Sequence, residues 1–256
     1  MTKIISIHSF RGGTGKSNTT ANLAAVIAAQ GKRVAIIDTD IQSPGIHVLF
    51  GLDEGSTQLS LNDYLWGRCS LQDAAYEVTP AAIAQAQGKI FLVPCSIKMG
   101  EIARILKEGY NVLLLTQGLH EICLSLALDY LLIDTHPGMN EETLLSIAIS
   151  NQLIVILRPD QQDFQGTAVT LQVAQKLNTP RISLLVNKLL PKYNPKEVQA
   201  QISAKFNTPV LGVFPVTEEM MDLGSKGIFV LEYPDNPYTA TMKQVVEAIT
   251  VGPAVS

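Results

Sequence analysis

Cysteine is scarce in this sequence, and the three cysteines are far apart. No two of them form a C-x-x-C or C-x-C pair, which argues against a disulfide framework and against a zinc or iron–sulfur site built on such a motif. We expect Cys69, Cys95 and Cys123 to be buried thiols.

Charged residues and long apolar runs are also few. Only 16% of the residues are charged, yet the most apolar stretch, from Val112 to Ile133, is interrupted by polar or charged side chains. These are Gln117, His120, Glu121 and Asp129. A membrane-spanning helix needs roughly 18 to 20 apolar residues without such breaks. The sequence therefore predicts no membrane-spanning helix.

The composition argues against two further features. The formal net charge is −4, which argues against an attraction of the whole protein to nucleic acid. The few residues before the apolar run that starts at Ile4 do not resemble a cleavable signal. We therefore expect a cytoplasmic protein.

Short apolar runs recur along the chain with helical patterns between them. Runs that are apolar on both faces are typical of buried parallel strands. They are Ile4 to Ile7, Val34 to Ile37, Ile90 to Val93, Leu131 to Ile133, Leu153 to Leu157, Ile182 to Val186 and Val210 to Phe214. This alternation predicts an α/β fold with a doubly wound, mostly parallel sheet and helices on both faces. We expect one domain over residues 1–256.

Several helices are predicted with their ends. One spans Ser17 to Gln30, and another begins after Asn140, whose side chain can cap it. The last spans Tyr238 to Ile249, with its apolar side facing the core. Strand signals are weaker between Gly55 and Gly88. There we expect surface helices at Leu59 to Trp66 and Leu71 to Tyr76.

A glycine-rich loop joins the first strand to the first helix. Its sequence from Arg11 to Ser17 is R-G-G-T-G-K-S. Backbone N–H groups in such a loop, together with the helix N-terminus, bind phosphate oxygens. We expect contacts to a nucleotide from Gly12, Gly13, Thr14, Gly15, Lys16, Ser17 and Asn18. The Lys16 ammonium is expected between the β and γ phosphates of ATP, with the Ser17 hydroxyl on Mg²⁺.

Acidic residues follow two other predicted strands. Asp38 and Asp40 come after the second strand, and Asp134 comes after the strand at Leu131 to Ile133. Because the carboxyl ends of parallel strands meet at one edge, these carboxylates are expected beside the phosphate loop. Asp134 is predicted to hold Mg²⁺ through water. Asp38 is either close to the metal or a helix cap.

Two more polar positions follow from the same logic. Asn187 ends the strand at Ile182 to Val186, and its amide can donate to and accept from an adenine edge. His136 follows Asp134 in the loop D-T-H-P-G, where it is either a proton shuttle or a hydrogen-bonded loop residue, and Gly138 in that loop is expected to contact the γ phosphate.

These motifs resemble the ATPases of the MinD/ParA group, over nearly the whole chain. The resemblance implies a variant Walker A loop in which Arg11 stands at the family's signature lysine, a group that reaches across a dimer to the partner's phosphates. Arginine keeps the charge but not the shape of lysine, and the alternative is a solvated loop arginine. It also implies that Asp40 positions the attacking water, that Asp38 lies near the metal, and that Asn187 and Pro215 contact the base. For Pro215, an ordinary turn proline is the alternative.

The resemblance implies an activity as well. Such proteins bind Mg-ATP, form a homodimer around it and hydrolyse it slowly, and a partner protein stimulates them. A positioning or partitioning switch is the first hypothesis. The alternative is a metallochaperone, targeting or reductase-type delivery ATPase, and against it stands the lack of paired cysteines. A small-molecule ligase on this scaffold is a third reading.

One region carries a local excess of positive charge. Between Lys176 and Lys205 there are six basic residues and Glu197 is the only acidic one. This pattern is compatible with non-specific DNA binding, but a solvated surface explains it as well. The segment from Thr250 to Ser256 has no basic residue, so we do not expect stable membrane anchoring.

Overall fold

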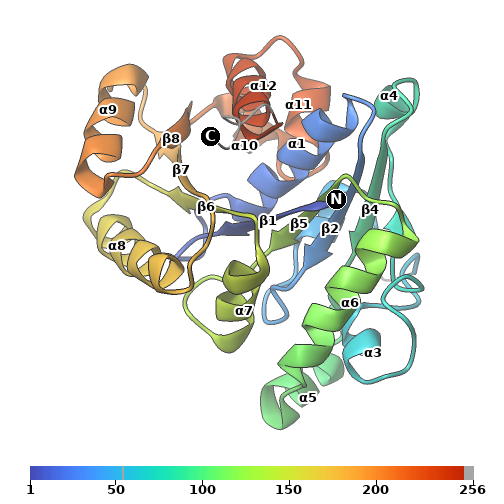
Figure 1. The fold of residues 1–256 in the computed structure, drawn as a ribbon. Helices are drawn as coiled ribbons and strands as arrows, with labels where there is room; N and C mark the ends of the chain where they lie inside the picture. Colours follow the sequence, from blue (N-terminus) through green and yellow to red (C-terminus); the bar gives the residue numbers. More distant parts are fainter. Residues whose placement is uncertain (54, 251–256) are drawn as a thin grey trace.

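One eight-stranded sheet forms the centre of the molecule (Figure 1). The structure is a computed structural model and describes residues 1–53 and 55–250. The strand order is β3-β4-β2-β5-β1-β6-β7-β8, and every pair is parallel except β3 with β4. The strands are β1 (Lys3–His8), β2 (Arg33–Asp38), β3 (Tyr76–Glu77), β4 (Lys89–Val93), β5 (Tyr130–Asp134), β6 (Gln152–Leu157), β7 (Ile182–Leu189) and β8 (Val210–Pro215).

Helices cover both faces of this sheet. They are α1 (Lys16–Ala28), α2 (Ile46–Leu49), α3 (Leu61–Leu65), α4 (Ala81–Ala84), α5 (Met99–Glu108), α6 (Val112–Ser125), α7 (Glu141–Ile149), α8 (Gln161–Lys176), α9 (Pro195–Phe206), α10 (Glu218–Leu223), α11 (Phe229–Glu232) and α12 (Pro237–Thr250). Figure 1 shows α1, α11 and α12 on one side and α6, α7 and α8 on the other. The predicted doubly wound sheet is therefore confirmed.

The strands bury both of their faces because successive side chains point in opposite directions. Ile5 and Ile7 of β1 belong to the apolar cluster that includes α1, α11 and α12. Ile4 belongs to the cluster formed with α3, α5 and α6. A third cluster joins β6 and β7 to α7, α8 and α9. This burial on two sides explains why all seven apolar runs predicted as strands are strands.

The predicted helix ends also agree with the structure in three places. Helix α1 ends at Ala28, close to the expected end before Gly31. The Asn140 side chain caps α7 by accepting from the Thr143 N–H at 2.8 Å. Helix α12 buries the predicted apolar side, which includes Met242 and Val246.

Two predictions for the middle of the chain were wrong. Residues 71–76 do not form a helix, because Leu71 is buried in the core while Tyr76 begins the antiparallel edge strand β3. The Tyr76 hydroxyl donates to the Leu59 carbonyl at 2.9 Å and thereby fixes the segment. Cys69 is only half-buried, whereas Cys95 and Cys123 are buried as expected.

The described residues include no helix that is both long and apolar enough to span a membrane. Residues 251–256, which carry part of the expectation about membrane anchoring, lie outside the described residues.

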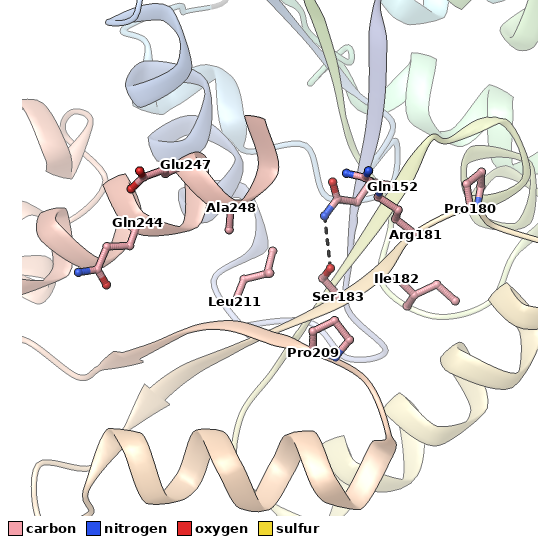
Figure 2. Close-up of a pocket in the computed structure, with 10 residues that line it drawn as sticks. All are labelled: Gln152, Pro180, Arg181, Ile182, Ser183, Pro209, Leu211, Gln244, Glu247 and Ala248. Atoms are coloured by element: carbon pink, nitrogen blue, oxygen red, sulfur yellow. Dashed lines mark hydrogen bonds between the residues drawn. The ribbon is translucent and has the colours of Figure 1, made fainter. Parts of the chain in front are cut away.

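A cavity of about 910 Å³ lies at the amino ends of β6 and β7 (Figure 2). Its wall includes Gln152 and Ser183, which share a hydrogen bond of 3.3 Å, and residues of the last turns of α12. None of the residues predicted to bind nucleotide or metal lines it. The candidate site lies at the opposite, carboxyl edge of the sheet.

Candidate functional site

The loop between β1 and α1 has a backbone that only glycine adopts easily. Gly13 has φ 75° and Gly15 has φ 91°, both in the left-handed region. A Cβ on Gly15 would also lie 2.4 Å from Asn187 Nδ2. Gly15 is the N-cap of α1, so the loop leads directly into the positive end of a helix. This arrangement is suited to bind an anion.

Lys16 and Ser17, the first residues of α1, both contact Asp134 at the end of β5. The Lys16 ammonium is buried and lies 3.0 Å from Asp134 Oδ1. The Ser17 hydroxyl donates to Asp134 Oδ2 at 2.7 Å, and the Thr20 hydroxyl donates to Oδ1 at 3.1 Å. The structure thus brings together the residue predicted for phosphate and two of those predicted for Mg²⁺.

Asp38 lies next to Asp134 in the sheet, because β2 and β5 pair with these two residues in register. Asp38 is fully buried, and its Oδ1 accepts from the Asp40 N–H at 2.9 Å. Burial and the neighbouring Asp134 raise the pKa of Asp38 well above its usual range. The helix-cap alternative for Asp38 is wrong, since the next helix begins only at Ile46.

Asp40 is held by residues of two loops. Its Oδ1 lies 2.6 Å from His136 Nδ1 and accepts from the Ser43 N–H at 3.2 Å. Its Oδ2 lies 3.8 Å from the Lys16 ammonium. His136 is therefore a hydrogen-bonded loop residue. The Gly138 N–H, which was expected to face a γ phosphate, donates instead to the Ser9 carbonyl at 3.2 Å.

The donor set at this edge suits Mg²⁺, which prefers oxygen ligands and retains several waters. Ser17, Asp38 and Asp134 supply hydroxyl and carboxylate oxygens. Among the described residues, Asp38 Oδ2 is buried without a hydrogen-bond partner, as expected of an acceptor meant for a cation. No group of three or more metal-ligating side chains forms a ready cage within residues 1–53 and 55–250. A cation here would take its remaining ligands from phosphate and water.

Two cavities of about 310 Å³ each meet at Gly15 and Asn18. One lies over the loop and is lined by its glycines together with Thr14, Lys16, Ser17, Asp40 and His136. The other is lined by Asn187, Lys188, Pro215, Val216, Thr217, Met220, Met221 and Tyr238. A ligand with a charged end and a flat apolar end therefore fits across both.

Asn187 and Lys188 tie the second cavity to the loop. Asn187 Nδ2 donates to the Thr14 carbonyl at 2.8 Å, and the Lys188 ammonium donates to the Gly13 carbonyl at 2.7 Å. Lys188 has a backbone φ of 57°, in the left-handed region that residues other than glycine adopt rarely. The Asn187 amide thus uses one of its two N–H groups on the loop in this structure. Its predicted contact with a base stays a prediction.

Sequence reasoning missed part of this cavity. Lys188 directly follows Asn187, so adjacency was the available signal. Met220 and Met221 of the short helix α10 line the cavity, and so does Tyr238 of α12. No local pattern distinguishes these residues from ordinary packing positions.

The start of the loop rests on helix α8. The Arg11 guanidinium is partly exposed and lies 3.4 Å from Asp163 and 3.7 Å from Asp160, the N-cap of α8. Phe10 packs against Gly166, where a Cβ would lie 2.2 Å from the phenyl ring. Arg11 therefore contacts its own chain in this structure, and its predicted role across a dimer stays a prediction.

The basic residues between Lys176 and Lys205 are distributed over α8, β7, α9 and the loops between them. Arg181 precedes β7 and Lys188 lies near its carboxyl end, so the strand separates them by about 20 Å. Lys196 and Lys205 lie at opposite ends of α9 in the same way. Binding of non-specific DNA through this region therefore stays a prediction.

Comparisons with known proteins agree with this geometry. The model of the ParA family, described as an NUBPL iron-transfer P-loop NTPase, matches residues 1–250. An uncharacterized ATP-binding protein of Methanocaldococcus jannaschii is 28% identical over 94% of this chain and 85% of its own. An iron–sulfur cluster carrier protein of Pyrococcus furiosus is 23% identical over 96% of this chain and 84% of its own.

A solved structure supports the fold. The septum site-determining protein MinD of Pyrococcus horikoshii, in complex with Mg-ADP, superposes with a TM-score of 0.80 at 21% identity. The match covers 98% of this chain and 96% of that protein. At this identity the likeness concerns the fold alone.

Proposed function

This chain belongs to the ParA family of P-loop NTPases, and we propose that it is a Mg-ATP-binding, slowly hydrolysing switch that acts as a single domain and dimerises around its nucleotide. The observation that carries the proposal is the pair of cavities that meet at Gly15 and Asn18. One presents the phosphate loop with Lys16, and the other is walled by Asn187, Pro215 and methionines. Triphosphate and base are the two ends that this pair would receive.

The phosphate end has a defined set of roles. Lys16 would exchange its contact with Asp134 for the β and γ phosphates, and N–H groups of Gly12, Gly13, Thr14 and Gly15 would surround their oxygens. The Ser17 hydroxyl would bind Mg²⁺ directly. Asp134 would hold the metal through water, and Asp38 would lie close to it. A bound Mg²⁺ neutralises phosphate charge as it develops in the transition state.

Hydrolysis needs a positioned water more than a strong base. Asp40 is suited to this task, because its Oδ2 faces Lys16 within the cavity over the loop. We assign the water to Asp40. Arg11 is the first residue of the phosphate loop, so its side chain would reach the nucleotide of a facing subunit if it left Asp163. We infer that an activating partner protein governs this step.

An iron–sulfur delivery role is the second candidate, because the matching family model is described by iron transfer and one relative carries clusters. The cysteines argue against it, since no two of them form a C-x-x-C or C-x-C pair and Cys95 and Cys123 are buried. The Cys95 thiol donates to the Asp38 carbonyl at 3.0 Å. Anaerobic reconstitution with iron and sulfide decides between the two. We expect no cluster absorbance, and a stable cluster would favour the delivery role.

The proposed ATPase is tested with Asp40→Ala. We expect this variant to bind Mg-ATP with the affinity of the unsubstituted protein but to release phosphate at least about tenfold more slowly, since Asp40 is assigned to the water. Size-exclusion chromatography with ATP should show the dimer of Asp40→Ala persisting. Turnover at the unsubstituted rate would show that Asp40 has another role, and no turnover in either protein would contradict the ATPase.

A further inference from the structure

The link between Asp40 and His136 joins two loops that are far apart in the sequence. Asp40 follows β2, His136 follows β5, and the two are 96 residues apart. Their side chains lie 2.6 Å apart, and only about 10% of the Asp40 side chain and 21% of that of His136 are exposed. A short, largely buried hydrogen bond of this kind restricts the rotation of both groups.

The direction of this hydrogen bond follows from its partners. An ionised carboxylate only accepts, so His136 must carry a proton on Nδ1 and donate it to Asp40 Oδ1. The Ser43 N–H donates to the same oxygen at 3.2 Å. Oδ1 is therefore engaged by protein donors on two sides, and Oδ2 is the oxygen left facing Lys16 and the cavity over the loop.

The backbone of His136 is held by its surroundings. The Thr143 hydroxyl of α7 donates to the His136 carbonyl at 3.2 Å, and Pro137 follows with a restricted backbone. Lys16 lies on the other side of Asp40 at 3.8 Å and attracts the same carboxylate. Without His136, nothing in the described residues except the Ser43 N–H would keep Asp40 Oδ1 turned away from the ammonium.

We propose that His136 is a positioning residue that holds Asp40 so that Oδ2 alone points to the attacking water. This inference rests on the proposed ATPase function and adds a residue to it. His136 acts through Asp40, although it also lines the cavity over the loop. Its loss lets the carboxylate turn toward Lys16, so the water is misplaced while the phosphate loop still binds Mg-ATP.

Three substitutions of His136 test the inference through kinetics. His136→Asn keeps an N–H donor close to the position of Nδ1, His136→Gln moves the donor outward by one bond, and His136→Ala removes it. We expect kcat to fall about 10- to 100-fold in the Ala and Gln variants with KM for Mg-ATP unchanged, because a misplaced catalytic group costs on this scale. The Asn variant should stay within about threefold of the unsubstituted protein.

A second readout does not need activity. In protein labelled with ¹⁵N-histidine, the imidazole of His136 should show a proton on Nδ1, and Asp40→Ala should remove this preference. A full-rate Ala variant, an Asn variant as slow as Ala, or a change confined to KM would each overturn the inference. If the unsubstituted protein shows no turnover, the proposed function fails, and the nuclear magnetic resonance measurement still decides whether His136 holds Asp40.

Discussion

At the scale of single residues, the site is a set of buried charges that balance one another. Lys16, Asp134 and Asp38 are each at most 5% exposed. The Lys16–Asp134 contact offsets the cost of burying both groups, whereas Asp38 is left with one unpartnered oxygen among the described residues. Such a cluster is stable only if a ligand or a cation completes it or if a proton replaces the charge. This arrangement supports the proposal that the site binds Mg²⁺ and phosphate.

His8 behaves in a different way beside this cluster. It is fully buried, with Nδ1 2.8 Å from the Thr135 hydroxyl oxygen. Burial and the nearby Lys16 lower the pKa of His8 to about 3 from an ordinary value of 6.5. As the pH falls below 6.5, His8 is protonated in the unfolded chain but stays neutral in the folded protein. The stability from neutral His8 is therefore complete above pH 6.5 and is lost as the pH falls toward 3.

We predict that His8→Asn loses less stability in acid than the unsubstituted protein does. The asparagine keeps a polar group near Thr135 but cannot titrate. Linkage gives about 2 kcal/mol of His8-dependent loss between pH 7 and pH 5. Urea unfolding at both pH values measures it, and other titrating groups cancel in the comparison. An equal acid-induced loss in both proteins would contradict the pKa shift of His8.

At the scale of secondary structure elements, the phosphate loop and helix α8 behave as one unit. Phe10 packs against Gly166 of α8, and Arg11 contacts Asp163 at its first turn. The absence of a side chain at Gly166 is what makes room for the phenyl ring. The usual spacing of the motif has glycine where Phe10 stands, so Gly166 compensates for this bulky residue. Movement of the loop would therefore change these contacts with α8.

We predict that Gly166→Ala destabilises the protein by about 1 to 3 kcal/mol, because its Cβ would overlap the phenyl ring of Phe10. Combining it with Phe10→Ala should make Gly166→Ala nearly harmless. Gln165→Ala, at an exposed neighbouring position on α8, serves as the control. Chemical denaturation measures the unsubstituted protein, the two single variants, the double variant and the control. The same cost for Gly166→Ala with and without Phe10 would show that the two residues do not interact.

Elements with a strong local pattern could be predicted from the sequence, and the contacts between them could not. Strands such as β1 and β6 are buried on both faces, so their apolar runs are unambiguous. The phosphate loop is recognisable because only glycine adopts its backbone. By contrast, Arg11 and Asp163 are 152 residues apart, and only packing of the whole sheet brings them together. The prediction of a helix at residues 71–76 was wrong because a buried leucine is compatible with a loop as well as with a helix.

At the scale of the whole molecule, the sheet order determines where the site lies. β1 is central, with β5 and β2 on one side and β6, β7 and β8 on the other. The chain passes from β1 to β2 on one side and later from β5 past β1 to β6 on the other, so the strand order reverses beside β1. Ligands of open α/β sheets bind at such a switch point beyond the carboxyl ends of the strands. The loops after β1, β2, β5 and β8, together with the last residues of β7, contribute to the two cavities. One edge of one sheet therefore carries the complete candidate site.

At the same scale, substitutions of Arg11 test the proposed dimer. If Arg11 leaves Asp163 and stabilises the partner's transition state, Arg11→Ala should lose turnover on the order of 10³-fold. Mixing Arg11→Ala with Lys16→Ala protein should restore activity, since the first subunit keeps its ATP site and the second supplies Arg11. Arg11→Lys serves as the conservative control. If Arg11→Ala dimerises but the mixture stays inactive, Arg11 acts within its own chain.

The central claim is that the phosphate loop binds Mg-ATP, and calorimetric titration tests it most directly. Titration of the unsubstituted protein with Mg-ATP should give saturable binding at one site per chain. Lys16→Ala should abolish that binding, because the buried ammonium is the main positive charge for the phosphates, while Lys192→Ala at an exposed position should leave it unchanged. Equal affinity of the Lys16→Ala variant and the unsubstituted protein for Mg-ATP, or no binding by either, would contradict the account.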